Sequence, residues 1–252
     1  MIEASYEFRP RSVGEILKEA FGLCRRHPAV LVLPYAIVFG FAALLLGLLV
    51  EQPASAEPTP KQVNSYRALA YFAQATAELV TYPMVMFGAG QLCGGRQPRI
   101  QEVILGSIPG LGRYFLTFLL VLPAVLAGLL AFLLPGLYLG LIWFLSPAVC
   151  VHERLRGSRA LGRSSDLSKD QISRILGLVV VGVILRVLFE GTSALLVVWI
   201  PVGGPLAMVG AHAAGEGFSM TCLVLLYIDI RTRSEGLGGE AFARELDSGR
   251  PR

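Results

Sequence analysis

Two long apolar stretches decide the fold: QISRILGLVVVGVILRVLFEGTSALLVVW at residues 171–199 and PVGGPLAMVGAHAAGEGFSMTCLVLLYIDI at residues 201–230. Each is longer than the about 20 apolar residues that an α-helix needs to cross roughly 30 Å of hydrocarbon. Neither shows the alternation of apolar and polar residues that is typical of a half-buried strand. Because backbone groups in lipid must be hydrogen-bonded within the segment, both stretches are predicted to be membrane-spanning helices.

The composition of the whole chain agrees with this prediction. Hydrophobic residues make up 54% of the 252 residues and charged residues only 16%. These proportions exceed the apolar content that a soluble core of this size can use. We therefore predict an all-α, polytopic integral membrane protein.

Further apolar segments bring the expected number of transmembrane helices to six. The predicted spans are residues 28–50, 66–92, 114–133, 137–151, 171–199 and 205–230. A Leu-Pro-Gly sequence at residues 134–136 has the chemistry of a tight turn, so its two flanking spans should form one of three hairpins. Gly136 and Gly140 have the spacing of small residues that allows two helices to approach closely.

An amphipathic or polar helix is expected before each hairpin, on the cytoplasmic side. Ser12 and Glu15 form a capping box that starts the first of them, within residues 1–27. Its apolar stripe and basic residues predict a helix that lies in the membrane surface. A helix packed on a partner protein would show the same pattern. Two similar helices are expected to begin near residues 100 and 158.

The distribution of positive charge predicts the orientation. Of the 22 lysine and arginine residues, 19 lie in segments that share one side of the membrane if the chain has six spans. Such an excess marks the cytoplasmic side. We therefore expect a protein of a bacterial cytoplasmic (inner) membrane with both termini in the cytoplasm, and a cytoplasmic polar tail at residues 231–252.

Ionisable residues deep in the predicted spans are the candidate functional residues. They are Glu78, Arg186, Glu190, His212 and Glu216. A charged group at the centre of a span costs about 2.5–3.5 kcal/mol on insertion scales, so these groups are expected to meet as a mid-membrane polar cluster. Arg186 and Glu190 can pair along one helix, as can His212 and Glu216, because each pair is four residues apart.

The predicted cluster has three interpretations. It could form a proton or cation pathway in which carboxylates and His212 exchange protons. It could bind a divalent metal through His212, Glu216 and one of Glu78 or Glu190. It could also be a satisfied buried network that fixes helix register. The third interpretation leads, so no metal ligand and no cofactor is predicted.

The sequence shows none of the motifs that would indicate an enzyme. It contains no P-loop, no G-x-S-x-G, no H-E-x-x-H and no dinucleotide fingerprint. We predict no catalytic residue. The net charge of +4 is spread over the cytoplasmic rim, so anionic lipid headgroups and a protein partner are expected rather than nucleic acid.

Three stretches resemble a known family. Residues 8–17 (FRPRSVGEIL), followed by Phe21 and the arginines at 25–26, resemble the start of bacterial proteins grouped as the membrane domain of glycerophosphodiester phosphodiesterases and of related six-span families of unknown function. Residues 143–148 and 226–231 are similar to later landmarks of the same family. The resemblance implies a stand-alone six-span unit without phosphodiesterase activity, because the catalytic His, Glu and Asp pattern of the soluble barrel has no match here.

These observations predict a non-enzymatic membrane module that organises lipid or partner proteins. The alternative is a small transporter or channel-like protein with a mid-membrane proton or cation site.

Overall fold

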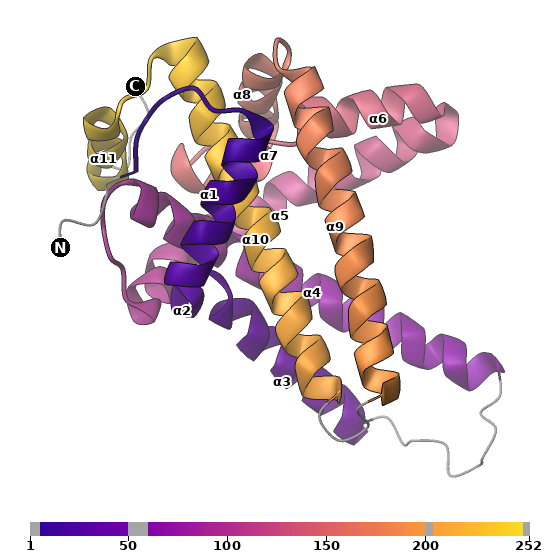
Figure 1. Cartoon of the computed structure of the whole chain (residues 1–252). Helices are drawn as coiled ribbons and strands as arrows, with labels where there is room; N and C mark the ends of the chain where they lie inside the picture. Colours follow the sequence, from indigo (N-terminus) through magenta and orange to yellow (C-terminus); the bar gives the residue numbers. More distant parts are fainter. Residues whose placement is uncertain (1–5, 50–59, 200–203, 249–252) are drawn as a thin grey trace.

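The computed structural model describes residues 6–49, 60–199 and 204–248. Within these ranges some side chains lie outside the description, namely those of residues 46–49, 60, 62–63, 66–67, 189–190, 192–199 and 204–207. The described residues form α-helices joined by short turns and loops, which confirms the all-α class (Figure 1).

The helices follow one another along the chain in a simple order. They are α1 (Val13–Arg26), α2 (Pro28–Leu31), α3 (Leu33–Leu49), α4 (Pro60–Cys93), α5 (Ile100–Ala131), α6 (Leu133–Ile142), α7 (Ser146–His152), α8 (Ser158–Ser168), α9 (Ile172–Trp199), α10 (Gly204–Glu235) and α11 (Gly239–Ser248).

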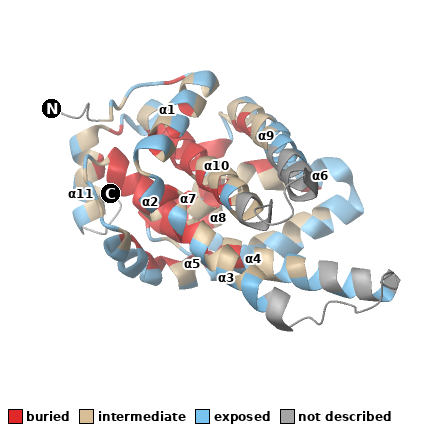
Figure 2. Cartoon of the chain, turned by 60° about the horizontal axis from the view of Figure 1, so that its bottom comes forward, coloured by how far each residue is buried: buried red, intermediate tan, exposed pale blue. Residues whose placement is uncertain are grey.

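Helix α10 is the centre of the bundle. It packs against α1, α3, α4 and α9, and in Figure 2 the buried residues gather around it, α1 and α7. Its most apolar window is 72% buried inside the protein. A helix that is apolar on all sides needs such cover on all sides, and the run Leu223–Tyr227 is accordingly buried.

The N-terminal amphipathic helix begins as the sequence predicts. The Ser12 hydroxyl accepts from the Glu15 amide, and the Glu15 carboxylate accepts from the Ser12 amide at 2.7 Å. That bond from the Ser12 backbone, together with the Arg9 guanidinium and the Ser12 hydroxyl, lowers the pKa of Glu15 to about 2, so the cap is intact at any pH well above that value. The apolar stripe of Ile16, Ala20 and Leu23 is buried in the core. These three residues are therefore covered within the chain, whereas Phe21 on the same helix is 63% exposed and stays available to lipid or a partner protein.

Helix α5 joins two elements that the sequence separates. The amphipathic stretch near residue 100 and the span predicted at 114–133 form one continuous helix, with Pro109 and Pro123 inside it. Prolines are tolerated in membrane helices, where neighbouring groups satisfy the freed carbonyls. The chain reverses at Phe132, which has an extended backbone, and the predicted turn residues 134–136 instead lie in the first turn of α6.

The α5–α6 hairpin is held together by close backbone contact. A Cβ atom built on Gly136 would lie 2.4 Å from the backbone nitrogen of Leu129, and one built on Gly128 would lie 2.9 Å from Gly136 Cα. Gly136 thus supports the prediction of close helix approach. Gly140 does not, because a Cβ atom built there meets nothing within 4 Å.

The two glycines provide a matched test. Gly136→Ala is expected to lower the stability of the protein by about 1 kcal/mol, because the methyl group forces the two backbones apart. Gly140→Ala should leave stability unchanged or slightly raise it. Thermal unfolding in detergent measures both variants. Equal melting temperatures for the two would contradict tight packing at Gly136.

The described residues hold fewer membrane-spanning candidates than the six predicted. Among the described residues, three helices are long and apolar enough to cross a membrane: Ile100–Ala131, Leu133–His152 and Met208–Glu235. A fourth is obtained if α8 and α9, bent by 102° at their junction, count as one span. The chain is therefore a candidate multi-pass membrane protein, with three or four candidate spans in the part that the structure describes. The described apolar part of α3, Leu33–Leu45, is shorter than a span, and α4 carries a polar face.

The C-terminal segment folds back onto the bundle. Gly236, with a φ angle of 65°, ends α10 as glycine commonly does at this position. Helix α11 follows, and its Phe242 is buried with its ring 5.7 Å from that of Phe8 and 5.9 Å from that of His152. Residues 231–252, expected to form a polar tail, are therefore helical and docked over most of their described length.

Candidate functional site

The structure brings four of the five predicted residues together. Arg186 on α9 lies between two carboxylates, with its Nη1 atom 3.1 Å from Glu216 Oε1 on α10 and its Nη2 atom 3.5 Å from Glu78 Oε1 on α4. His212 lies one helical turn before Glu216. The side chain of Glu190 lies outside the described residues. The consecutive helices α9 and α10 therefore share one charged cluster with α4, which is distant in sequence.

Glu216 is the buried member of this cluster. Its side chain is 7% exposed, against 23% for Glu78 and 44% for Arg186. The hydroxyl of Tyr82 on α4 donates to Glu216 Oε2 at 2.6 Å. Both carboxylate oxygens of Glu216 are thus engaged, one by a guanidinium and one by a phenol, as a buried carboxylate requires.

His212 is connected to the same cluster through α4. The amide nitrogen of Gln74 lies 2.9 Å from Glu78 Oε1 and 3.1 Å from His212 Nε2. On its other side, the imidazole stacks on Phe39 of α3 at a centroid distance of 5.2 Å. His212 thus contacts α3 and α4, and Glu216 contacts α4 and α9. Together they tie α10 to these three helices.

A small pocket adjoins the cluster. It has a volume of about 20 Å³ and is lined by Arg186, His212 and Glu216 together with apolar and small residues of α9 and α10. This volume is about the room that one water molecule needs. Arg186 is the most exposed member of the cluster and Glu216 the most buried. The chain of polar contacts therefore runs inward from the Arg186 guanidinium through Glu216 to the Tyr82 phenol.

The described residues do not support the metal interpretation. Within the described ranges, no group of three histidine, cysteine, aspartate or glutamate residues is placed to hold a metal ion. Glu78 and Glu216 instead share Arg186, and a cation beside a guanidinium would be repelled.

Some cluster residues were foreseeable and others were not. Gln74 and Tyr82 share the helical face of Glu78, so periodicity alone predicts that they point the same way. Tyr35 and Phe39 were missed. Tyr35 is buried, and its ring stacks on Phe39 at 5.6 Å. The sequence of an apolar helix does not show whether an aromatic residue packs on a histidine ring or on ordinary apolar side chains.

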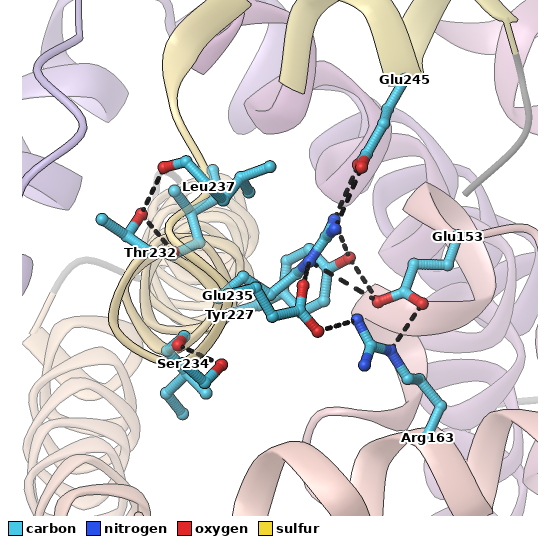
Figure 3. A network of polar contacts seen from close by, with 11 residues as sticks. Glu153, Arg163, Tyr227, Thr232, Ser234, Glu235, Leu237 and Glu245 are labelled. Atoms are coloured by element: carbon cyan, nitrogen blue, oxygen red, sulfur yellow. Dashed lines mark hydrogen bonds and ion pairs between the residues drawn. The ribbon is translucent and has the colours of Figure 1, made fainter. Parts of the chain in front are cut away.

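A second polar network, which the sequence did not predict, lies where α7, α8, α10 and α11 meet (Figure 3). Its centre is Glu153, which is buried and lies 2.8 Å from Arg163 Nε. The Tyr227 hydroxyl donates to Glu153 Oε1 at 2.9 Å. Arg163 also pairs with Glu235, which closes the network between α8 and α10.

Arg231 extends this network to the C-terminal helix. Its two terminal nitrogens donate to the two carboxylate oxygens of Glu245 at 2.7 and 3.1 Å, and its Nε donates to Glu235 at 2.8 Å. Such two-pronged pairing is the strongest geometry available to an arginine and a carboxylate. These residues were missed because charges at helix ends also serve to orient a membrane protein, so their positions did not indicate contact.

Comparisons of this chain with family models, with curated proteins and with solved structures found no match.

Proposed function

We propose that this chain is a non-enzymatic membrane module that organises lipid or a partner protein in a bacterial inner membrane. The observation that carries the proposal is the α5–α6 hairpin. The most apolar window of α5 has a mean hydropathy of 2.3, yet only 11% of it is buried inside the protein. In Figure 1 the hairpin extends sideways from α9 and α10.

The surface of the hairpin supports this role. Large apolar side chains are exposed along both of its helices and at its turn, among them Leu119, Leu126, Leu130, Phe132, Leu133 and Leu134. A contiguous apolar surface of this kind is stable only when lipid or another apolar surface covers it. Because the other described residues leave most of the hairpin uncovered, acyl chains or a partner's helices are its natural contacts.

The charged cluster fits a supporting role in the same proposal. Arg186 between Glu78 and Glu216 sets one register of α4, α9 and α10, because a shift by one turn would leave a charge without its partner. In this way the cluster holds the bundle rigid while the hairpin contacts its surroundings.

Topology and family are part of the proposal. We extend the candidate spans to the six predicted, with both termini in the cytoplasm, because 19 of 22 lysine and arginine residues then share one side. The resemblance of residues 8–17 to the six-span membrane domain of glycerophosphodiester phosphodiesterases supports the same arrangement, without the catalytic barrel.

Chemical labelling tests whether the hairpin is embedded. In a background without the four native cysteines, Leu119→Cys is expected to resist a membrane-impermeant maleimide in native membranes, because lipid covers an exposed position of α5. Lys169→Cys, in the polar turn between α8 and α9, is the control and should react once its side of the membrane is accessible. Equal labelling of the two in opened membranes would refute the embedded hairpin.

Transport is the second candidate function, and the pocket beside Arg186 and Glu216 is the observation that favours it. Carboxylates within spans are a feature of proton relays. If the pocket lies on such a path, Glu216→Gln should abolish pH-driven flux in proteoliposomes while preserving the Tyr82 hydrogen bond. A flux equal to that of the unmodified protein, or no flux in either, would count against transport.

A further inference from the structure

A pocket outside the charged cluster lies between the N-terminal segment and α1. The segment runs across one end of the molecule before α1 begins, as the indigo trace at the top of Figure 1 shows. The pocket has a volume of about 400 Å³, and most of its lining residues are charged. A space of this size can hold a small polar group with several water molecules.

The acidic side chains of this pocket are already paired. Arg9 lies 3.1 Å from Glu7 and 2.9 Å from Glu15. Arg26 lies 3.6 Å from Glu19. These contacts leave two further basic residues of the lining, Arg11 and Lys18, outside the ion pairs of the described residues.

Arg11 is held in place by its backbone while part of its side chain lacks a partner. Its amide donates to Asp229 Oδ1 at 2.6 Å, and its carbonyl oxygen accepts from Arg233 Nη2 at 2.9 Å and from Arg174. The residue is only 5% exposed. Its guanidinium carbon lies 4.1 Å above the ring of Tyr6, and its Nη1 atom has no hydrogen-bond partner among the described residues.

A buried cation without an acceptor is costly unless something else satisfies it. Leaving a buried charged donor unpaired costs more than the 1–3 kcal/mol typical of neutral groups. The contact with Tyr6 offsets part of this cost. Arg11 is also one of the residues that line the pocket, which is open enough to admit a ligand, although its Nη1 atom is itself enclosed. Lys18 of α1 adds a second, exposed positive charge to the lining.

We infer that this pocket binds a phosphate group through Arg11 and Lys18. An arginine that is rigidly placed beside a flexible lysine suits a tetrahedral oxyanion with two or more free oxygens. The phosphate belongs either to a phospholipid headgroup at the membrane surface or to a soluble phosphate compound. Only the lipid source rests on the proposed membrane role, since a soluble phosphate would bind whether or not the hairpin organises lipid.

The test uses the full chain and two probes. Purified protein in detergent is titrated with inorganic phosphate against sodium chloride of equal ionic strength, with thermal unfolding as the readout. The protein is also compared in nanodiscs of phosphatidylglycerol and of phosphatidylcholine. Arg11→Met is the main variant. Arg25→Met, an exposed arginine on the same helix outside the pocket, is the matched control.

A soluble phosphate is supported if phosphate stabilises the protein saturably and Arg11→Met weakens the apparent phosphate affinity by about tenfold or more. Arg25→Met should keep this affinity within about twofold of that of the unmodified protein. Stabilisation by phosphatidylglycerol alone, lost in Arg11→Met and kept in Arg25→Met, supports a lipid headgroup. Absence of both effects, or equal losses in the two variants, overturns the inference. If Arg11→Met does not yield folded protein, Lys18→Met replaces it, because Lys18 is exposed. Phosphate or lipid binding that Lys18→Met leaves unchanged would likewise overturn the inference.

Discussion

Replacing Arg231 by methionine is expected to destabilise the protein by about 3 kcal/mol, the lower part of the range measured when one partner of a buried ion pair is removed. Arg231 is buried and holds the two oxygens of Glu245 together with Glu235. Without it, these carboxylates remain close to Glu153 with only Arg163 to compensate them. We therefore expect α11 to detach before the rest of the bundle unfolds.

Hydrogen exchange measures this detachment directly. In Arg231→Met, amides of α11 should exchange much faster, whereas those of the buried part of α10 near Leu225 should stay protected until global unfolding. Arg244→Met is the control on α11. The Arg244 side chain is exposed, and its hydrogen bond goes to the backbone carbonyl of Glu240 within the same helix. Equal protection of α11 in the two variants would show that its docking depends on Phe242 rather than on the ion pairs.

Replacing Arg186 by methionine is expected to cost about 2 kcal/mol, less than a fully buried pair because its side chain is 44% exposed. The substitution leaves Glu78 and Glu216 on neighbouring helices without the cation between them. Their mutual repulsion and the burial of Glu216 both oppose the native packing of α4 against α10.

Unfolding in detergent or bicelles measures the loss. Val183→Met serves as the control, since Val183 is an exposed apolar residue on the same helix and its replacement should change stability by less than about 0.5 kcal/mol. If the two variants unfold at the same temperature, the three charges do not stabilise one another.

The charged cluster could largely be predicted from the sequence, because ionisable residues in apolar helices have few tolerable positions. The structure accordingly joins Glu78, Arg186, His212 and Glu216. The sequence predicted that His212 and Glu216 can pair with each other along α10, but it did not identify their partners on other helices. Contacts across helices depend on how the helices cross, and helical periodicity within one segment contains no information about crossing.

Other features could not be predicted, for physical reasons. The stripe of α1 has the same pattern whether lipid, a partner or the chain's own α10 covers it. The continuity of α5 through Pro109 depends on surroundings that satisfy the freed carbonyl. The network of Glu153 and Arg231 involves helix ends, where a charged residue is equally consistent with solvent contact and with an ion pair.

Arg186 and Glu216 are expected to stabilise the bundle as a pair, and a double-mutant cycle tests this pairing most directly. Arg186→Met, Glu216→Gln and the double variant are compared with the unmodified protein by reversible unfolding in bicelles. We predict that the double variant is more stable than the sum of the single losses implies, by about 1 kcal/mol or more. Losses that add within about 0.3 kcal/mol would contradict the claim.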